Sequence, residues 1–310
     1  MALGGNAIQR PGSDASVEGD FERTQDTAKH LVELAVQSNR RLVLSHGNGP
    51  QVGNHLLRSE LGHVHGGLPL LPLDVCVADT QGGMGYMLQQ CLTNAFQSAG
   101  MPAVVTTLVT QVVVDVADPA FDDPSKPVGD MIPADRLEEL TAQGWVLKED
   151  RKRKGWRRVV ASPDPIEIVE AEAIRAMVAE GVVVISAGGG GVPVAQSADG
   201  SLVGVPAVVD KDLATALLAR DLGAEAMLIL TDVEKVFLGW GTDDERTLDQ
   251  MTVAEARAYR DAGEFPAGSM GPKVEALCRF VEATRGLGII TSIEASASAL
   301  QGRTGTRVVP

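Results

Sequence analysis

The 310-residue chain is poor in cysteine, in aromatic side chains and in positive charge, and each shortage excludes a class of protein. Its three cysteines are far apart and form no Cys-x-x-Cys pair, which argues against a disulfide framework or a zinc site and favours the cytoplasm. Aromatic residues are 4% of the chain, which suits a core of Val, Ala and Leu. The formal net charge of −14 argues against nucleic acid or an anionic membrane as a partner, so an anionic small-molecule substrate needs locally placed lysines.

Long apolar runs are missing as well. No stretch reaches about 18 consecutive apolar residues, so the sequence predicts no membrane span. No basic region followed by an apolar run opens the chain, so no signal peptide is expected. The composition is otherwise that of a globular protein, with 44% hydrophobic and 22% charged residues. The length fits one large α/β domain or two joined domains.

Four consecutive glycines, residues 188–191, follow the all-apolar segment 182–185. Such a β-branched run is typical of a strand buried on both faces of a parallel sheet, so we expect a central strand here. The glycines remove every side chain from its carboxyl end, which lets backbone N–H groups approach a ligand closely. Similar strand, glycine and helix patterns at residues 2–6, 42–53 and 205–218 indicate a repeated βα arrangement.

Apolar periodicity and end signals predict the remaining elements. Helices are expected at residues 21–38, 77–98, 166–179, 210–222 and 252–262. A further helix should follow the loop 45–53 and end at about residue 61, and another should begin at 268. Strands are expected at residues 42–44, within 104–116, and at 205–209, 227–230 and 289–293, the last closing the sheet. Only three residues precede the first glycines, which is short for a central strand, so we expect the native start to lie upstream of Met1.

Residues 118–165 differ in character, because prolines and charges replace the apolar strands, and they are interpreted as an inserted subdomain. We expect a small helix at 134–143 and, after it, a hairpin. The hairpin tip, residues 148–158, holds seven basic residues in eleven. Contact with RNA is one interpretation, but the negative charge of the whole chain favours a solvated tip.

The loop after the expected strand 42–44 has three interpretations. A dinucleotide loop is disfavoured, because Gly47, Gly49 and Gly53 give GxGxxxG and no acidic residue ends a strand about 20 residues later. A plain tight turn is possible. An anion site at a helix N-terminus is favoured. Residues 268–273 lack the final Gly-Lys-Ser/Thr of a P-loop.

Charged residues near these loops are candidates for chemistry. Asp210, Lys211 and Asp212 follow the expected strand 205–209, at the edge where open α/β sheets bind ligands. A lone triplet of this kind is usually solvated surface, but the glycine loop about twenty residues earlier favours a functional role. Lys126 lies between two prolines, either as a stiffened functional lysine or as a solvated one. His63 and His65 are interpreted as part of a solvated loop rather than as a metal pair.

Six motifs together closely resemble those of the carbamate kinases, within the amino acid kinase superfamily. They are ALGGNA (2–7), SHGNGPQVG (45–53), TQVVVD (110–115), SAGGGGVP (186–193), VVDKD (208–212) and PAGSMGPK (266–273). The resemblance runs the whole length. It implies a three-layer αβα sandwich on a mainly parallel open sheet, with a protruding inserted subdomain. It further implies an acceptor-binding lobe at 1–117, the protruding subdomain at 118–165, a nucleotide-binding lobe at 166–310, and a homodimer.

The resemblance also implies roles for single residues. The expected catalytic residues are Lys126, Lys211, Lys273 and Asp212. The residues expected around the acceptor and the transferred phosphoryl group are Gly4, Gly5, Asn6, Gly47, Asn48 and Gly49. Asp210, Gly268 and Met270 match positions of the nucleotide pocket. No side chain is assigned as a metal ligand, since Mg²⁺ is expected to bind through the nucleotide phosphates.

The implied activity is ATP + carbamate ⇌ ADP + carbamoyl phosphate, in the ATP-forming direction of arginine catabolism. Carbamate is already an anionic oxygen nucleophile, so the transfer needs positioning and charge neutralisation rather than a general base. Two alternatives remain, namely another acid kinase of the same superfamily and a non-catalytic nucleotide-binding homologue. One departure concerns residues 149–155, EDRKRKG, where the family has Glu-Asp, a small residue and Gly-Arg-Gly.

Overall fold

A computed structural model describes residues 1–310 except 6–7, 9–15, 151–154 and 267–268. Its largest element is an eight-stranded sheet with the order β15-β17-β16-β12-β1-β2-β9-β3. All its neighbouring pairs are parallel except β16 with β17. The strands are β1 (Ala2–Leu3), β2 (Val43–His46), β3 (Val105–Thr107), β9 (Val183–Ile185), β12 (Ala226–Thr231), β15 (Gln250–Thr252), β16 (Leu287–Ser292) and β17 (Thr306–Val309).

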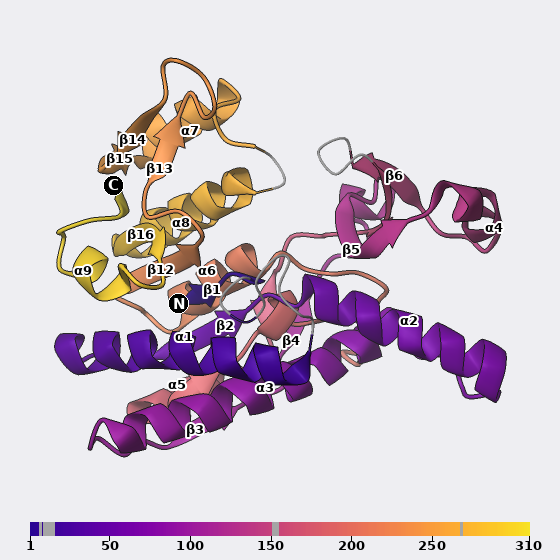
Figure 1. Cartoon of the computed structure of the whole chain (residues 1–310), viewed down its shortest axis with the longest axis horizontal. Coiled ribbons are helices and arrows are strands. Elements are labelled where there is room, and N and C mark those ends of the chain that lie inside the picture. Colours follow the sequence, from indigo (N-terminus) through magenta and orange to yellow (C-terminus); the bar gives the residue numbers. More distant parts are fainter. Residues whose placement is uncertain (6–7, 9–15, 151–154, 267–268) are drawn as a thin grey trace.

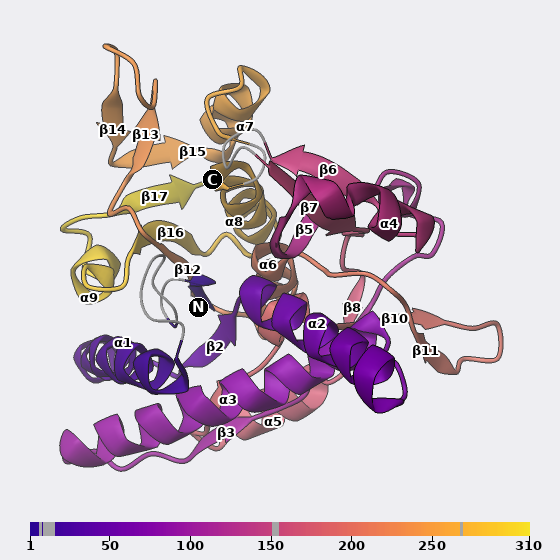
Figure 2. The ribbon, with the colours of Figure 1, turned by 45° about the vertical axis from the view of Figure 1, so that its right-hand side comes forward.

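Helices cover both faces of this sheet (Figures 1 and 2). One face packs on α1 (Val17–Ser38), α3 (Leu73–Ser98) and α9 (Ser296–Leu300). The other packs on α5 (Ala171–Ala179), α6 (Lys211–Asp221), α7 (Val253–Asp261) and α8 (Met270–Thr284). Alternation along β9 explains its uniform apolarity, because Val183 and Ile185 join the first core and Val184 joins the opposite one. The predicted three-layer sandwich is confirmed.

The strand 182–185 is interior but not central, since β9 lies between β2 and β3, one strand from the edge. The first strand, expected as a short central strand, does hold a central place. Ala2 pairs with Ile229 of β12 on one side and with Ser45 of β2 on the other. Leu3 is fully buried against the α1 and α3 side. The glycines after β1 and β2 are therefore adjacent, which positions the site described below.

Several predicted boundaries differ from the structure. The helix α2 (Gly49–Gly66) continues past residue 61, so His63 and His65 lie exposed on its last turns rather than in a loop. The helix α3 runs unbroken through its three glycines. Residues 166–179 begin with a strand, β8 (Glu167–Ile168), before α5. The sheet does not close at 289–293, because β17 follows and pairs with β16. The predicted capping box of Thr252 and Glu255 is present at α7.

The expected strand 205–209 is wrong. These residues are mostly buried, but only Ala207 forms a bridge, to Ala161. In the chain, they come directly after a hairpin of β10 (Val192–Gln196) and β11 (Leu202–Gly204). This hairpin belongs to a second sheet, β11-β10-β4-β8, with β4 (Gln111–Val113). Two strands in the C-terminal third of the chain, β13 (Val236–Leu238) and β14 (Arg246–Leu248), form a separate antiparallel pair.

Residues 118–165 contain a separate antiparallel sheet, β5-β7-β6, which projects beside α2 (Figure 1). Its elements are η2 (Pro119–Phe121), β5 (Lys126–Ile132), η3 (Ala134–Arg136), α4 (Leu137–Ala142), β6 (Leu147–Asp150) and β7 (Gly155–Val160). Contact with α2 is close, because a Cβ on Gly53 would lie 2.0 Å from the Cα atom of Gly129. The predicted hairpin is confirmed as β6 and β7, while residues 151–154 of its basic tip lie outside the described residues.

One basic residue of that hairpin, Arg158, is only partly exposed. The guanidinium of Arg158 lies 4.2 Å from the centre of the Trp145 ring and 3.3 Å from a carboxylate oxygen of Glu60 on α2. Burial lowers the pKa of Arg158 and raises the pKa of Glu60. The side chain therefore joins β7 to α2 by a partly buried ion pair, which corrects the expectation of a fully solvated tip at this position.

We predict opposite effects for two glycines of α3. Gly85→Ala should destabilise the protein by about 1–3 kcal/mol, because the new methyl group would overpack β3. Its Cβ would lie 2.2 Å from the Cγ2 atom of Thr107. Gly82→Ala, in open space on the same helix, should stabilise the protein by about 0.5–1 kcal/mol through helix propensity. Urea unfolding measures both. Equal effects of the two substitutions would contradict the close packing of α3 on β3.

Candidate active site

The carboxyl ends of three neighbouring strands meet at one edge of the main sheet. Gly4 and Gly5 follow β1, Gly47 follows β2, and the glycine run 188–191 follows β9. Parallel strands direct their following loops to the same edge, where open α/β sheets form ligand sites. The helix α6 begins at this edge, and its first residues and N-cap supply Asp210, Lys211 and Asp212.

Three lysines and two aspartates form one connected cluster at this edge. The Nζ atom of Lys126, on β5, lies 2.6 Å from Oδ2 of Asp210. Asp212 accepts from both remaining lysines, with Lys211 Nζ at 2.5 Å and Lys273 Nζ at 2.9 Å. Three ammonium groups and two carboxylates leave one formal positive charge. In a chain of net charge −14, this local excess suits an anionic ligand.

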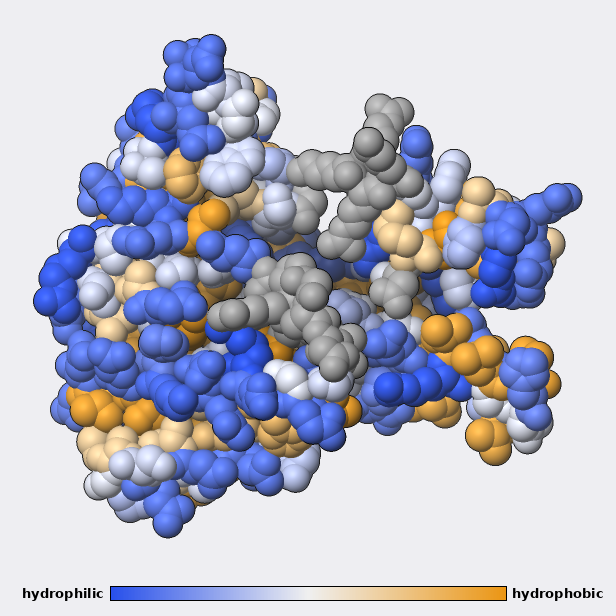
Figure 3. All heavy atoms as spheres, in the orientation of Figure 1, coloured by the Kyte–Doolittle hydropathy of each residue, from blue (hydrophilic) through white to orange (hydrophobic). Residues whose placement is uncertain are grey.

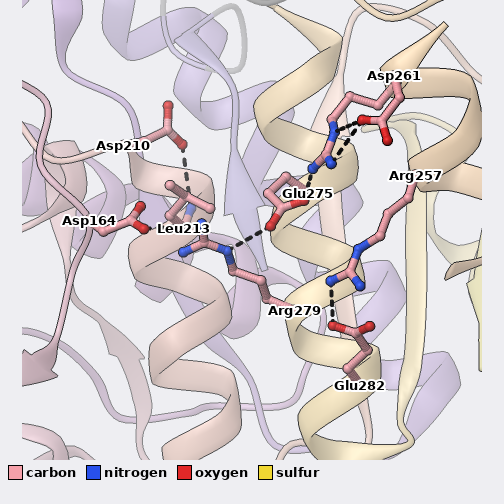
Figure 4. A network of polar contacts seen from close by, with 9 residues as sticks. Asp164, Asp210, Leu213, Arg257, Asp261, Glu275, Arg279 and Glu282 are labelled. Atoms are coloured by element: carbon pink, nitrogen blue, oxygen red, sulfur yellow. Dashed lines mark hydrogen bonds and ion pairs between the residues drawn. The ribbon is translucent and has the colours of Figure 1, made fainter. Parts of the chain in front are cut away.

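Asp210 belongs to a helix cap rather than to a strand end. Its Oδ1 atom accepts the backbone N–H groups of Asp212 at 2.9 Å and Leu213 at 3.4 Å, which caps α6 (Figure 4). Its Oδ2 atom receives Lys126. One carboxylate thus fixes the start of α6 and holds the lysine of the β5-β7-β6 sheet.

Burial and charge shape the pKa values of this cluster. Burial alone would raise the pKa of Asp210, but the adjacent Lys126 and Lys211 hold it well below its usual range. Burial also opposes the charge of Asp212, yet Lys211 and Lys273 lower its pKa overall. Burial lowers the pKa of Lys211 despite the nearby Asp212. For Lys273, the attraction and hydrogen bond of Asp212 outweigh burial and raise the pKa.

The glycines of the site allow close packing between loops. A Cβ on Gly47 would lie 3.4 Å from the Cδ atom of Lys211 and 3.9 Å from the backbone N atom of Gly5. The Asn48 side chain is buried and donates to Thr80 Oγ1 of α3 at 2.8 Å. Gly49 begins α2 with open space around it. The structure thus brings the loop after β2 against the lysine of α6.

Of the remaining predicted residues, the structure describes Met270 but not Asn6 or Gly268. Met270 is the first residue of α8 and packs, partly buried, against the core on the α7 and α8 side of the sheet. Within the described ranges, no group of three or more His, Cys, Asp or Glu residues could hold a metal ion. No helix in the described part of the chain is long and apolar enough to cross a membrane.

Sequence reasoning missed the polar residues behind the site. Ser45 of β2 and Thr215 of α6 share a hydroxyl hydrogen bond of 2.5 Å, although the two residues are 170 positions apart. Thr80 and Gln81 are buried on α3. A usable signal for the α3 pair is two polar residues within a stripe of buried positions that otherwise holds Cys76, Val77 and Met84.

A surface network supports α8 beside the cluster (Figure 4). The Nη2 atom of Arg279 lies 3.2 Å from Asp164, the end of the 118–165 segment, and its Nε atom lies 2.9 Å from Glu275. Arg260 of α7 binds the same Glu275. These partly exposed ion pairs contribute about 0–1 kcal/mol each, so they align α7, α8 and the segment end rather than determine the fold.

Comparison with known proteins identifies the family. The model of the amino acid kinase family matches residues 1–292. The carbamate kinase of Pyrococcus furiosus is 46% identical over 311 residues, covering all of this chain and 98% of that protein. The chain belongs to the carbamate kinases of the amino acid kinase family. The resemblance drawn from the six motifs is confirmed.

Further relatives cover the chain as completely. The carbamate kinase-like protein YahI of Escherichia coli is 45% identical over 311 residues, covering all of this chain and 98% of that protein. Among solved structures, carbamate kinase from Giardia lamblia bound to AMP-PNP has a TM-score of 0.91 at 39% identity. That comparison covers 99% of this chain and 96% of the other.

We predict a pH effect on stability from His46. Burial lowers the pKa of this residue to about 4. The hydrogen bond with the Gly47 carbonyl opposes this shift, and the positive charge of Lys211 adds to it. An unfolded histidine titrates near pH 6.5, so the stabilising contribution is complete above that pH and is lost as the pH falls toward 4. The expected loss is about 3 kcal/mol.

Urea unfolding at pH 7.5 and 4.5 measures this effect. His46→Asn should have a flatter dependence on pH than the unsubstituted protein, whereas exposed His65→Asn should keep the original slope. The same slope in all three proteins would show that His46 does not remain neutral in the folded state.

Proposed function

We propose that this protein transfers a phosphoryl group between ATP and carbamate, giving ADP and carbamoyl phosphate, and that it runs in the ATP-forming direction of arginine catabolism. Family membership supports the reaction. The observation that carries the proposal is the cluster of Lys126, Lys211 and Lys273 around two aspartates at the glycine-rich sheet edge. The direction rests on the resemblance and on chemistry, since carbamoyl phosphate is a mixed anhydride that readily gives up its phosphoryl group.

Each lysine has a proposed role. Lys211 and Lys273 neutralise the nucleotide phosphates and the migrating group, while Asp212 holds both ammonium groups in place. Lys126 reaches the transferring group from β5. Donors preorganised toward developing charge stabilise such a transition state without a general base. Backbone N–H groups at Gly4, Gly5, Gly47, Asn48 and Gly49 are proposed to bind the acceptor, with Asp210 and Met270 in the nucleotide pocket.

Mg²⁺ is proposed to enter with the nucleotide. The two carboxylates of the cluster already bind lysines, which leaves few protein ligands for a hard cation. Mg²⁺ is commonly held by one or two carboxylates, water and substrate phosphates, so this arrangement fits a phosphate-bound ion. When bound, the ion neutralises phosphate charge.

The division into lobes is part of the proposal. Residues 1–117 carry the acceptor loops, and residues 166–310 carry Lys211 and Lys273. Residues 118–165 form their own antiparallel sheet and contribute Lys126. Limited proteolysis that releases the 118–165 segment first would agree with this division, and early cleavage within the main sheet would contradict it.

A homodimer in the cytoplasm is also proposed. Apolar side chains that are more than a third exposed gather at the far end of α2 and beyond it, namely Leu57, Leu61, Val64, Leu68, Leu70 and Leu71. Figure 3 shows apolar surface in this region. Exposed apolar patches commonly mark protein interfaces. Light scattering should give twice the chain mass, and a single-chain mass would contradict the dimer. Cell fractionation tests the location.

We predict that the purified protein makes ATP from ADP and carbamoyl phosphate when Mg²⁺ is supplied. A coupled assay in both directions, at matched concentrations, should give the larger kcat/KM toward ATP. Absence of ATP above a no-enzyme control from folded protein would contradict the proposed function. A larger kcat/KM toward carbamoyl phosphate would contradict only the proposed direction.

We predict that substitutions of Lys126 and Lys273 affect different steps, turnover in the first case and nucleotide binding in the second. Lys126→Ala should lower kcat/KM for carbamoyl phosphate about 10²–10³-fold, the usual cost of one donor aimed at developing charge. Its ADP affinity, measured by calorimetry, should stay nearly unchanged, whereas Lys273→Ala should weaken ADP binding itself.

Lys148→Ala is a matched control for this experiment. Lys148 lies in the same β5-β7-β6 sheet and pairs with Asp123 at 2.6 Å, a carboxylate that is not part of the cluster. It should leave both quantities unchanged. A Lys126→Ala protein that loses ADP affinity as strongly as Lys273→Ala would show that the roles of the two lysines are assigned wrongly.

A further inference from the structure

The motif at residues 110–115 has no part in the roles proposed so far. Its first residue, Thr110, is fully buried in the connection between β3 and β4. The side chain of Gln81, on α3, binds both backbone groups of this residue. Gln81 Oε1 accepts from Thr110 N at 2.8 Å, and Gln81 Nε2 donates to Thr110 O at 3.0 Å. Both side chains are buried, so two hydrogen bonds fix Thr110 to α3.

Thr110 in turn holds both ends of the glycine loop. Its hydroxyl accepts from the backbone N–H of Ala187 at 2.9 Å, where the loop begins. Its carbonyl oxygen accepts from the backbone N–H of Val192 at 2.8 Å, where the loop ends. Ala187 has a φ of 49°, in the left-handed region that non-glycine residues rarely adopt. The surrounding hydrogen bonds must therefore hold this conformation.

The glycine loop packs directly against residues of the site. A Cβ on Gly188 would lie 2.4 Å from His46 Nε2, and one on Gly189 would lie 2.2 Å from Asn48 Nδ2. A Cβ on Gly190 would lie 2.1 Å from the carbonyl oxygen of Val209, the residue before Asp210. The glycine loop thus lies between the loop after β2 and the start of α6, so a shift of the loop moves both.

We propose that Thr110 and Gln81 are positioning residues of the phosphoryl-transfer site. They fix the glycine loop, and the loop sets the places of Asn48 and Asp210. This inference rests on the proposed function, but it assigns a role to residues outside the lysine cluster. Misplacement of reacting groups by about 1 Å costs about a hundredfold in rate, so the effect should appear in turnover.

Thr110→Val tests the inference, because it removes the hydroxyl group and nearly keeps the shape. It should lower kcat/KM for carbamoyl phosphate about ten- to a hundredfold, while ADP affinity by calorimetry stays within about twofold. Thr110→Ser retains the hydroxyl and should restore most of the activity. Hydrogen exchange of the Ala187 and Val192 amides should be faster in Thr110→Val than in Thr110→Ser, a measurement that needs no turnover.

Thr306→Val is the matched control. Thr306 is also fully buried, and its hydroxyl likewise accepts a backbone N–H, from Val236 at 2.8 Å, and donates to a backbone carbonyl, that of Leu248. Its loss should cost comparable stability and leave kcat/KM within about twofold. An active unsubstituted protein with equal losses for Thr110→Val and Thr306→Val, or with no loss for Thr110→Val, would overturn the inference. An inactive unsubstituted protein would contradict the proposed function instead.

Discussion

The carboxylate of Asp212 is the group on which the site depends. Its side chain is 3% exposed, and each of its oxygens receives one ammonium group, from Lys211 or from Lys273. A buried charge without a partner costs several kcal/mol, so these groups are stable only together. Because the two lysines belong to α6 and α8, the same ion pairs join two of the four helices that cover one face of the sheet. The electrostatics of the site and the packing of the fold are thus a single arrangement.

Glycine determines how closely the loops around this group approach. His46, the buried Asn48 amide and the Val209 carbonyl leave no room for a Cβ at Gly188, Gly189 and Gly190, respectively. A glycine loop at a sheet edge is often explained by ligand contact alone. Here its close protein contacts are a second reason for glycine, because the loop packs against His46 and Asn48 on one side and Val209 on the other.

Charge distribution connects this geometry to the reaction. The chain carries a formal charge of −14, which repels anionic ligands over most of its surface, yet the cluster at the sheet edge has an excess of one positive charge. Lys126 comes from a separate small sheet, which is joined to α2 by the close approach of Gly129 to Gly53 and by the partly buried Arg158–Glu60 pair. The place of Lys126 in the cluster therefore depends on how that sheet packs on α2.

The sequence by itself determined the layers, the family and the five residues of the lysine cluster, because apolar periodicity, caps and short motifs are local properties of the chain. The uniform apolarity of β9, the capping box at Thr252 and the VVDKD motif are examples. Only the tertiary structure decided that residues 205–209 form no ladder, that β9 lies one strand from the edge, and that Thr110 holds both ends of the glycine loop. Strand partners, buried polar pairs and glycine contacts join residues far apart in sequence, so no local pattern specifies them.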